Sequence, residues 1–375
     1  MKKTDDDNVK STTGMNILIL SNLTSYTYNF RLEILKAMVD SGHRVTVACD
    51  NDDNGKQQEL EALGCTMVEV PFNGKGTNPS EELKLLNTYG KLVKQQDPDI
   101  VFSFTIKMNL YGGLAAKKYK VPFVPMITGL GELEKTGKLR AVLMFLHKRV
   151  MPYAKAVVFQ NRANIDFFSE NGIRTKRNVL VPGSGINLQK FPYCGYPSEE
   201  KGLRFAFIGR LTYAKGILEY LGMAEREKKL HPDYSFLIAG VCDSEYRDRV
   251  EALQKEGVVE YLGQLADTRD LLKGIHCIVL PTFHPEGLSN VLLEASATGR
   301  PAICTSRPGC REVVQDGVNG LYCESRNVDD LVAVVDRFCS LSARDHEAMG
   351  REGRRIVEER FDRSIVVDAY MELLK

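Results

Sequence analysis

Residues 275–299 read Ile275-His-Cys-Ile-Val-Leu-Pro281-Thr-Phe-His284-Pro-Glu286-Gly-Leu-Ser-Asn290-Val-Leu-Leu-Glu294-Ala-Ser-Ala-Thr-Gly299. The apolar run at the start has the length of a strand and ends at a proline. After a loop, apolar residues recur at helical spacing until a glycine ends the pattern. The stretch therefore predicts a strand, a loop and a helix, the repeating unit of a parallel α/β sheet. Such sheets bind ligands at the carboxyl ends of their strands.

The predicted loop has the composition of a phosphate site. A helix begins with backbone N–H groups that have no partner inside the helix, and the helix dipole favours an anion there. A glycine in the loop also lets the backbone come close to a ligand. The residues expected to present unpaired N–H groups to a phosphate are Gly287, Leu288, Ser289 and Asn290.

Two glutamates, Glu286 and Glu294, flank the start of this predicted helix. Carboxylates are poor partners for phosphates, but they accept hydrogen bonds from pairs of hydroxyl groups. Glu286 in the loop therefore suits a sugar. Glu294 lies roughly 9 Å further along the helix axis, with its Cβ tilted back toward the N-terminus, and suits a ribose. His284, beside Glu286, is a further candidate for a hydrogen bond to the transferred sugar.

A cationic segment follows another predicted strand. Gly209-Arg210-Leu211 and Lys215-Gly216 come directly after the apolar run that ends at Ile208. Arg210 and Lys215 can neutralise a diphosphate and the charge that grows on it as it leaves. Together with the loop and the two glutamates, they predict a nucleotide-sugar site, and the predicted catalytic residues are Arg210, Lys215 and Glu286.

Strands alternate with helices in both halves of the chain, which predicts two doubly wound parallel sheets. In the first half we expect strands at 17–20, 45–49, 67–70, 100–104, 123–127, 156–159 and 179–181. In the second half we expect them at 205–208, 235–239, 259–262, 275–280 and 302–305. The expected organisation is a disordered leader (1–14), an acceptor-binding domain (15–190), a linker (191–202), a nucleotide-sugar-binding domain (203–360) and a C-terminal helix (361–375).

Composition excludes several classes of protein. The 375 residues fit two domains, and their net charge of +1 argues against a nucleic-acid binder. The apolar stretches are too short to cross a bilayer, and the polar, acidic start does not read as a signal peptide, so a cytoplasmic protein is expected. The nine cysteines lack Cys-x2-Cys spacing and are expected as reduced thiols rather than zinc ligands. We expect no metal and no cofactor.

These motifs together resemble family 4 of the retaining glycosyltransferases. The resemblance covers nearly the whole chain from Met15. The first half looks most like bacterial enzymes that extend polyprenyl-diphosphate-linked sugars, including N-acetylgalactosaminyltransferases and capsular polysaccharide enzymes. Besides the Glu-x7-Glu and Gly-Arg-Leu…Lys-Gly motifs, the segments that carry the resemblance are Gly183-Ser-Gly-Ile-Asn187, Arg-Phe-Asp362, Tyr28-Asn-Phe-Arg31 and Gly129-Leu-Gly131.

The resemblance implies a GT-B fold, in which two Rossmann-like domains face each other across a cleft and the last helix returns to the first domain. It implies transfer of an N-acetylhexosamine or hexose from a UDP-sugar to a polyprenyl-diphosphate-linked saccharide, with retention at the anomeric carbon. Such an enzyme acts at the cytoplasmic face of the inner membrane. Sugar-nucleotide 2-epimerases share this fold and stay open as an alternative, as does a non-catalytic subunit that binds a sugar nucleotide.

Two rival enzyme classes fit the sequence less well. A dinucleotide-dependent dehydrogenase needs Gly-x-Gly-x-x-Gly after its first strand, whereas residues 21–29 read Ser21-Asn-Leu-Thr-Ser-Tyr-Thr-Tyr-Asn29. A glycosidase also uses two carboxylates, but it has no need of the cations Arg210 and Lys215. The Asp97-Pro-Asp99 segment mimics a metal-binding Asp-x-Asp, but it is better explained as a turn before a strand.

The acceptor side is predicted from five residues and one helix. Residues 135–154 combine an apolar stripe at 139, 142, 143, 146 and 150 with flanking lysines and arginines. Such a helix either lies on an anionic membrane, with Met144 and Phe145 dipping inward, or packs on the first domain. Many relatives carry a histidine where this chain has Ile106, which puts a histidine contact to the sugar in doubt. The other acceptor candidates are Arg31, Lys107, Asn109, Gly129 and Gly131.

Overall fold

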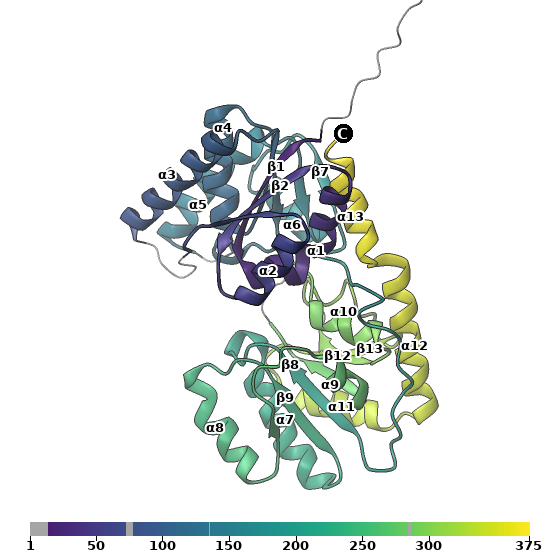
Figure 1. Cartoon of the computed structure of the whole chain (residues 1–375). Coiled ribbons are helices and arrows are strands. Elements are labelled where there is room, and N and C mark those ends of the chain that lie inside the picture. The colour runs from purple at the N-terminus through teal and green to yellow at the C-terminus, as the bar shows by residue number, and fades with distance from the viewer. Residues whose placement is uncertain (1–13, 73–77, 135, 284–286) are drawn as a thin grey trace, which may run out of the picture.

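The computed structural model describes residues 14–72, 78–134, 136–283 and 287–375. They form two α/β domains stacked end to end, and each domain has one parallel sheet (Figure 1). The first sheet has the strand order β3-β2-β1-β4-β5-β6-β7, and the second β10-β9-β8-β11-β12-β13. Two doubly wound parallel sheets were the expected architecture, and this prediction is confirmed.

The first domain contains seven strands and six α-helices within the described residues. The strands are β1 (Asn16–Leu23), β2 (Arg44–Asp50), β3 (Thr66–Glu69), β4 (Ile100–Phe104), β5 (Phe123–Ile127), β6 (Val157–Phe159) and β7 (Asn178–Leu180). The helices are α1 (Thr24–Asp40), α2 (Asn54–Ala62), α3 (Pro79–Gln96), α4 (Gly113–Tyr119), α5 (Lys138–Val150) and α6 (Arg162–Glu170). Every residue of β4 and β5 is buried, as expected for central strands that helices cover on both faces.

The second domain follows the same plan. Its strands are β8 (Arg204–Ile208), β9 (Ser235–Ala239), β10 (Glu260–Tyr261), β11 (Cys277–Leu280), β12 (Ala302–Thr305) and β13 (Gly320–Cys323). The later helices are α7 (Ile217–Leu230), α8 (Ser244–Lys255), α9 (Arg269–Gly274), α10 (Asn290–Ala297), α11 (Val328–Cys339), α12 (Ala343–Arg360) and α13 (Arg363–Glu372). All twelve expected strands form, and β13 is the strand that the sequence analysis missed.

The chain crosses between the domains twice, and the two crossings lie side by side. Ile186 in the first crossing pairs with Asp362 in the second through a parallel bridge. Arg363 forms an ion pair with Glu33 of α1 at 2.7 Å, and Asn187 donates to the other oxygen of that carboxylate at 2.8 Å. Burial alone would raise the pKa of Glu33. The positive charge and hydrogen bond of Arg363, together with the hydrogen bond from Asn187, outweigh this effect of burial, so the pKa of Glu33 is lowered.

The C-terminal helices tie the two domains together along one side of the molecule (Figure 1). α12 packs against α10 of the second domain, and α13 packs against α1 of the first. Val366 and Tyr370 of α13 are fully buried in the core of the first domain, where Tyr370 lies against Phe102 with ring centroids 5.4 Å apart. The last helix is therefore an integral part of the first domain.

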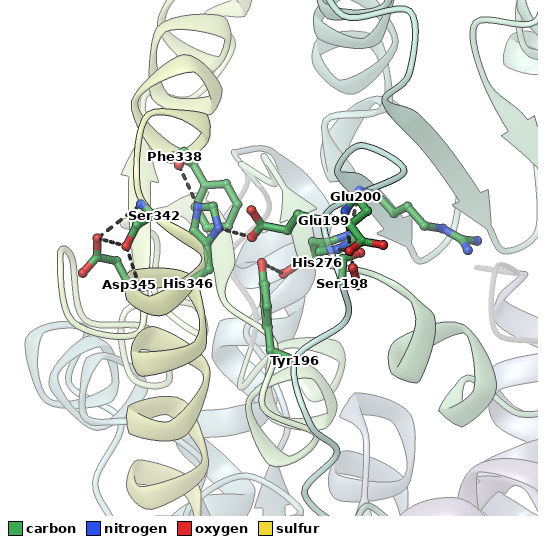
Figure 2. Close-up of polar contacts among 10 residues, drawn as sticks. Tyr196, Ser198, Glu199, Glu200, His276, Phe338, Ser342, Asp345 and His346 are labelled. Atoms are coloured by element: carbon green, nitrogen blue, oxygen red, sulfur yellow. Dashed lines mark hydrogen bonds and ion pairs between the residues drawn. The ribbon is translucent and has the colours of Figure 1, made fainter.

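The segment after the first crossing is attached firmly to the second domain, as Figure 2 shows. The hydroxyl of Tyr196 donates to the carbonyl of His276 at 3.2 Å. Glu199 contacts Nδ1 of the buried His346 on α12 at 2.7 Å, and Nε2 of that ring lies 2.8 Å from the carbonyl of Phe338. Because residues 196–200 are held in this way, any hinge between the domains lies closer to Ile186 and Asp362.

Candidate active site

The main cleft lies between the two domains and has a volume of about 540 Å³. Strand ends and α1 of the first domain form one wall, and the loops after β8 and β11 form the other. Residues of the first domain that line the cleft include Ser21, Phe30, Arg31, Thr105, Lys107, Gly129, Gly131, Gln160 and Ser184. The second domain contributes Arg210, Gly287, Leu288 and Asn290.

A smaller pocket of about 140 Å³ continues from this cleft. Phe30 and Asn290 line both spaces, so the two meet at these residues. The small pocket draws its walls from both domains and from both crossings, because Gly185, Lys190 and Arg363 line it together with Glu294. A ligand that extends from the small pocket into the cleft therefore contacts both domains.

Glu294 faces the small pocket from α10. The hydroxyl of Thr268 donates to its Oε2 at 2.8 Å, and Lys190 and Arg363 lower its pKa only in part. Burial dominates and raises the pKa of Glu294 to about 7. A carboxylate that has lost its water, and that has few partners within the protein, is suited to accept hydrogen bonds from a ligand's hydroxyl groups.

The cationic turn is fixed against the end of β11. Tyr213–Lys215 form one turn of 3-10 helix, and Gly216 follows with φ of 79°. A Cβ on Gly216 would lie 2.3 Å from the carbonyl oxygen of Pro281, so only glycine allows this close contact. The Thr282 hydroxyl and the Phe283 N–H both donate to the carbonyl of Ala214 at 3.1 Å. Lys215 is thereby held beside the loop that follows β11.

Arg210 and Gly209 occupy the expected place at the end of β8. Arg210 is exposed and lines the cleft. The N–H of Gly209 donates to the carbonyl of Ala239 at 2.9 Å, and a Cβ on Gly240 would lie 1.8 Å from the carbonyl oxygen of Gly209. Close backbone packing between the ends of β8 and β9 therefore fixes the position from which Arg210 reaches the cleft.

The loop before α10 reaches across to the first domain. A Cβ on Gly287 would lie 2.0 Å from Oε1 of Gln160 and 2.3 Å from the carbonyl oxygen of Thr128. Asn161 donates through Nδ2 to the carbonyl of Gly287 at 2.7 Å. The glycine is therefore needed for contact between the domains as well as for any approach to a phosphate. The predicted residues Glu286 and His284 lie outside the described residues.

One part of the predicted phosphate site is wrong. Ser289 is buried, and its N–H donates to the carbonyl of Gly309 at 2.9 Å, so it does not point to a ligand. α10 begins one residue later, at Asn290, which lines both the cleft and the small pocket. Leu288 lines the cleft, and its side chain packs against Gly183 of the first crossing.

Arg31 is a buried cation in the wall of the cleft. Its Nη1 donates to the hydroxyl of Ser184 at 2.8 Å and to the carbonyl of Phe30 at 2.9 Å, and its guanidinium lies 4.4 Å from the ring centroid of Phe104. Burial lowers the pKa of Arg31 to about 10. Within the described part of the chain it forms no ion pair with a carboxylate, so an anion in the cleft can take that place.

The other acceptor candidates divide into cleft residues and a core residue. Gly129 and Gly131 line the cleft, as does Lys107, which forms an ion pair with Glu82 at 2.6 Å. Asn109 does not reach the cleft, and its assignment to the acceptor is corrected. It is buried, its Oδ1 accepts from the Ser103 hydroxyl at 2.7 Å, and its Nδ2 donates to the Met126 carbonyl at 2.8 Å. Asn109 therefore joins β4 to β5.

Two family models match the chain. "Glycosyl transferase 4-like" matches residues 16–161, and "Glycosyl transferases group 1" matches residues 195–356. The chain is a glycosyltransferase. The two matches fall on the two domains, and the second match includes the cationic turn, the loop after β11 and Glu294.

Several relatives of the chain are bacterial transferases. The chain is 27% identical over 378 residues to the N,N'-diacetylbacillosaminyl-diphospho-undecaprenol alpha-1,3-N-acetylgalactosaminyltransferase of Campylobacter jejuni, covering 96% of this chain and 98% of that protein. It is 25% identical over 286 residues to an Escherichia coli UDP-Gal:alpha-D-GlcNAc-diphosphoundecaprenol alpha-1,3-galactosyltransferase, covering 72% and 73%. A capsular polysaccharide glycosyltransferase, CapM of Staphylococcus aureus, is 24% identical over 301 residues, covering 76% and 78%.

Solved structures share the fold. HepE of Anabaena, in complex with UDP and glucose, superposes with a TM-score of 0.78 at 19% identity, covering 96% of this chain and 99% of that one. TarM superposes with a TM-score of 0.74 at 11% identity, covering 97% and 100%. With these matches and the two facing parallel sheets, the predicted GT-B fold is confirmed.

The glycosyltransferase also has cleft residues that the sequence analysis missed. Gln160 directly follows β6, so its place at the end of a parallel strand was a usable signal. Thr268 and Lys190 line the small pocket but come from loops with no such signal. Thr105 has φ of 75°, a costly conformation for a β-branched residue, and it lines the cleft directly after β4.

The glycosyltransferase should lose activity when Gly287 is replaced by alanine. The added Cβ would collide with Gln160 and with the backbone of Thr128, so the domains cannot close on the donor. We expect transfer to fall by about 100-fold or more, since misplacement of about 1 Å near the chemistry has that effect. Initial rates measure this loss. Gly90→Ala is the control, because a Cβ there meets nothing within 4 Å. Equal rates for the two variants would contradict the close contact.

The apolar stripe of α5 splits between the core and the solvent. Leu143, Met144 and Leu146 pack against the core of the first domain, and His147 and Val150 are buried. Met144 therefore faces the protein, which corrects its expected role at a membrane. Arg140 is also engaged, because it donates to the Leu133 carbonyl and to Asn171. The large apolar residues of α5 that stay exposed are Leu139, Val142 and Phe145.

No helix within the described ranges of this glycosyltransferase has both the length and the apolar character needed to span a bilayer.

Proposed function

We propose that this glycosyltransferase moves a sugar from a UDP-linked donor to a polyprenyl-diphosphate-linked saccharide, with retention at the anomeric carbon. The observation that carries the donor side is the pair of connected pockets: Glu294 faces the small one and Arg210 the large one. Because Phe30 and Asn290 line both pockets, one ligand could place a ribose in the small pocket and a sugar diphosphate in the cleft. The donor assignment also draws support from the Escherichia coli relative, whose name includes UDP-Gal, and from HepE, which was solved in complex with UDP and glucose.

The acceptor assignment rests on the cation in the far wall of the cleft. A polyprenyl-diphosphate-linked saccharide carries two phosphates, and Arg31 is a buried guanidinium that no carboxylate of the described residues neutralises. Gly129 and Gly131 leave room for the saccharide beside it. Relatives that act on diphospho-undecaprenol sugars favour the same chemistry.

We infer that the chemical step proceeds without a metal ion. Arg210, which lines the cleft, and Lys215, on the turn that follows it, would supply to the departing diphosphate the positive charge that other transferases obtain from a metal. The leaving phosphate accepts the proton of the attacking hydroxyl on the same face of the sugar. Initial rates should therefore be the same with and without EDTA, and a rate that collapses in EDTA and returns with Mg²⁺ or Mn²⁺ would contradict this inference.

Turnover with a panel of UDP- and GDP-sugars tests the proposed function. The reactions are run with and without a polyprenyl-diphosphate-linked saccharide in detergent, and the products are separated by chromatography. We expect transfer only when the lipid-linked saccharide and one UDP-sugar are present together. Transfer to soluble acceptors alone would overturn the acceptor assignment. Conversion of a UDP-sugar into its 2-epimer would move the chain to the epimerases.

We further infer that α5 rests on the cytoplasmic face of an anionic membrane. Leu139, Val142 and Phe145 are exposed on this helix, and Phe145 is 56% exposed. The end of α4 lies against the end of α5, since Lys117 donates to the carbonyl of Arg149 at 3.2 Å. The exposed cations around the apolar residues are Lys117, Lys118, Lys120, Lys138, Lys148 and Arg149. Apolar side chains ringed by cations fit a bilayer with anionic headgroups.

Replacing Phe145 by glutamate should weaken binding to vesicles that contain anionic phospholipid. Burial of one phenylalanine contributes about 1.5–3 kcal/mol, so we expect a loss of about 10-fold or more in the partition coefficient. Cosedimentation with the vesicles measures it. Val318→Glu, at an exposed apolar residue of the second domain, is the matched control and should bind like the wild type. If both variants bind equally well, α5 is not the membrane face.

A further inference from the structure

The second domain contains a cluster of metal-binding side chains far from the cleft. Glu227 near the end of α7, His231 directly after that helix, and Asp336 on α11 each direct one ligand atom to a common point. These atoms all lie within 4.8 Å of one another. Glu227 and His231 are four residues apart, which places them on the same face at the helix end. Figure 1 shows α7 and α11 together in the lower part of the second domain.

Glu227 is the observation that points to a ligand. The residue has no solvent exposure, and neither of its carboxylate oxygens has a hydrogen-bond partner. No lysine or arginine of the described chain forms an ion pair with Glu227 or Asp336. A buried carboxylate without a partner costs folding free energy, and a second carboxylate nearby adds repulsion. A bound cation would remove both costs.

The surroundings hold the three side chains in place. The ring of His231 stacks on Tyr234 with centroids 4.4 Å apart. Lys228 donates to the carbonyls of Pro232 and Tyr234 at 2.7 Å, which fixes the turn after α7. Lys228 is thus occupied by carbonyls instead of the carboxylates. The imidazole and the carboxylate of Asp336 stay accessible, so an ion can enter from solvent.

We propose that Glu227, His231 and Asp336 bind a divalent transition-metal ion, with Zn²⁺ as the representative, and that this ion joins α7 to α11. One imidazole and two carboxylates form the N/O donor set of zinc sites, which bind at about 2.0–2.2 Å. The ligand atoms, which all lie within 4.8 Å of one another, would have to move closer together to form such bonds. The imidazole favours a transition metal over Mg²⁺ or Ca²⁺.

The ion would have a structural role. α7 begins directly after Lys215 and Gly216, and Glu227 lies ten residues further along it, roughly 15 Å at 1.5 Å per residue. Such a distance excludes contact between the ion and the transferred sugar. The ion would instead fix the far end of the helix that begins at the cationic turn, and it would supplement the ion pair between Arg226 and Asp329 on the same two helices.

Binding of Zn²⁺ and Co²⁺ to the EDTA-treated, tag-free full chain tests the proposal. We expect one ion per chain, a higher Tm with Zn²⁺, and a Co²⁺ spectrum of N/O ligation without a thiolate charge-transfer band. His231→Ala and Glu227→Gln should each lower the affinity by about 100-fold or more, because losing a residue that only hydrogen-bonds to a metal ligand already costs about 10- to 100-fold. Glu256→Gln, at an exposed carboxylate after α8, is the matched control and should bind like the wild type.

Three outcomes would overturn the site. The first is wild-type affinity in His231→Ala, and the second is a Tm that Zn²⁺ does not raise. The third is a thiolate band that persists when Cys339, which lies beside Glu227 and Asp336, is replaced by serine, because it would place the ion on other cysteines. Glu227→Gln gives an independent measurement if His231→Ala fails to fold.

Discussion

Lys215→Ala should lower kcat for sugar transfer by about 1,000-fold while the protein stays folded. A preorganised cation at the position where negative charge develops is worth about 10²–10³ in rate, and the departing diphosphate carries more charge than a typical oxyanion. Lys215 is held for this task by the turn that Gly216 closes against Pro281. Its side chain is only half-buried, so its removal leaves no large cavity. Release of UDP and formation of product, followed by chromatography, measure the rate.

The control for this experiment is Lys255→Ala. Lys255 ends α8, is exposed, and is not part of the cationic turn that holds Lys215. It should retain wild-type kcat, which shows that loss of one positive charge from the second domain is not sufficient to stop transfer. Thermal unfolding of both variants separates a catalytic effect from a folding effect. A kcat for Lys215→Ala within about threefold of the wild type would remove this residue from the leaving-group site.

Much of the fold could be predicted from the sequence, because its strands are local signals. β4, β5 and β12 begin and end where the apolar runs of the sequence begin and end. β13 was missed, since Gly320-Leu-Tyr-Cys323 is short, begins with glycine, and has only one fully apolar aliphatic residue. Its place as an edge strand comes from pairing with β12 along Ala302–Thr305, which no local pattern reveals.

The candidate site was predicted in part, and the misses share a cause. Residues that follow strands, such as Arg210 and Gly129, line the cleft because parallel strands end at a common edge. Ser289 was misassigned because its partner, Gly309, is distant in sequence. Asn109 was misassigned because its side-chain amide forms hydrogen bonds with Ser103 of β4 and Met126 of β5. The sequence does not show that these two strands meet at Asn109. Hydrogen bonds between distant segments decide whether a polar residue serves a ligand or the core.

The contact between the domains could not be predicted for the same reason. Gly287 was expected to approach a phosphate, but its nearest neighbours are Gln160 and Thr128 of the other domain. The crossings add to this contact, since Arg363 both pairs with Glu33 and lines the small pocket. A nucleotide in that pocket, as proposed, would touch both crossings between the domains. Donor binding and domain closure would then share residues, which would make closure depend on the donor.

Glu294→Gln should weaken the binding of a UDP-sugar by about 10- to 100-fold at pH 8. An ionised carboxylate that accepts hydrogen bonds contributes about 1.5–3 kcal/mol, and a neutral amide replaces it poorly. The pKa of Glu294 is about 7, so wild-type affinity should fall as the pH drops from 8 to 6, whereas the variant should show no such change. Calorimetric titration measures the affinity of the wild type and of the variant at each pH. The ligand is a UDP-sugar rather than UDP, because the diphosphate of a UDP-sugar does not titrate in this range.

The same substitution should stabilise the ligand-free protein. The pKa of Glu294 is about 7 in the folded protein, above the ordinary value of 4.5. Between pH 4.5 and pH 7 the folded protein therefore binds more protons than the unfolded chain does. The free energy of unfolding of the wild type therefore falls as the pH rises from about 4.5 to 7, and Glu294→Gln removes that fall. At pH 8 the variant should be more stable by ~1–3 kcal/mol, with no difference near pH 4.5. Unchanged donor affinity together with unchanged stability would show that Glu294 does not face the nucleotide. A gain in stability with a loss of affinity is the result expected of a carboxylate kept buried for its ligand.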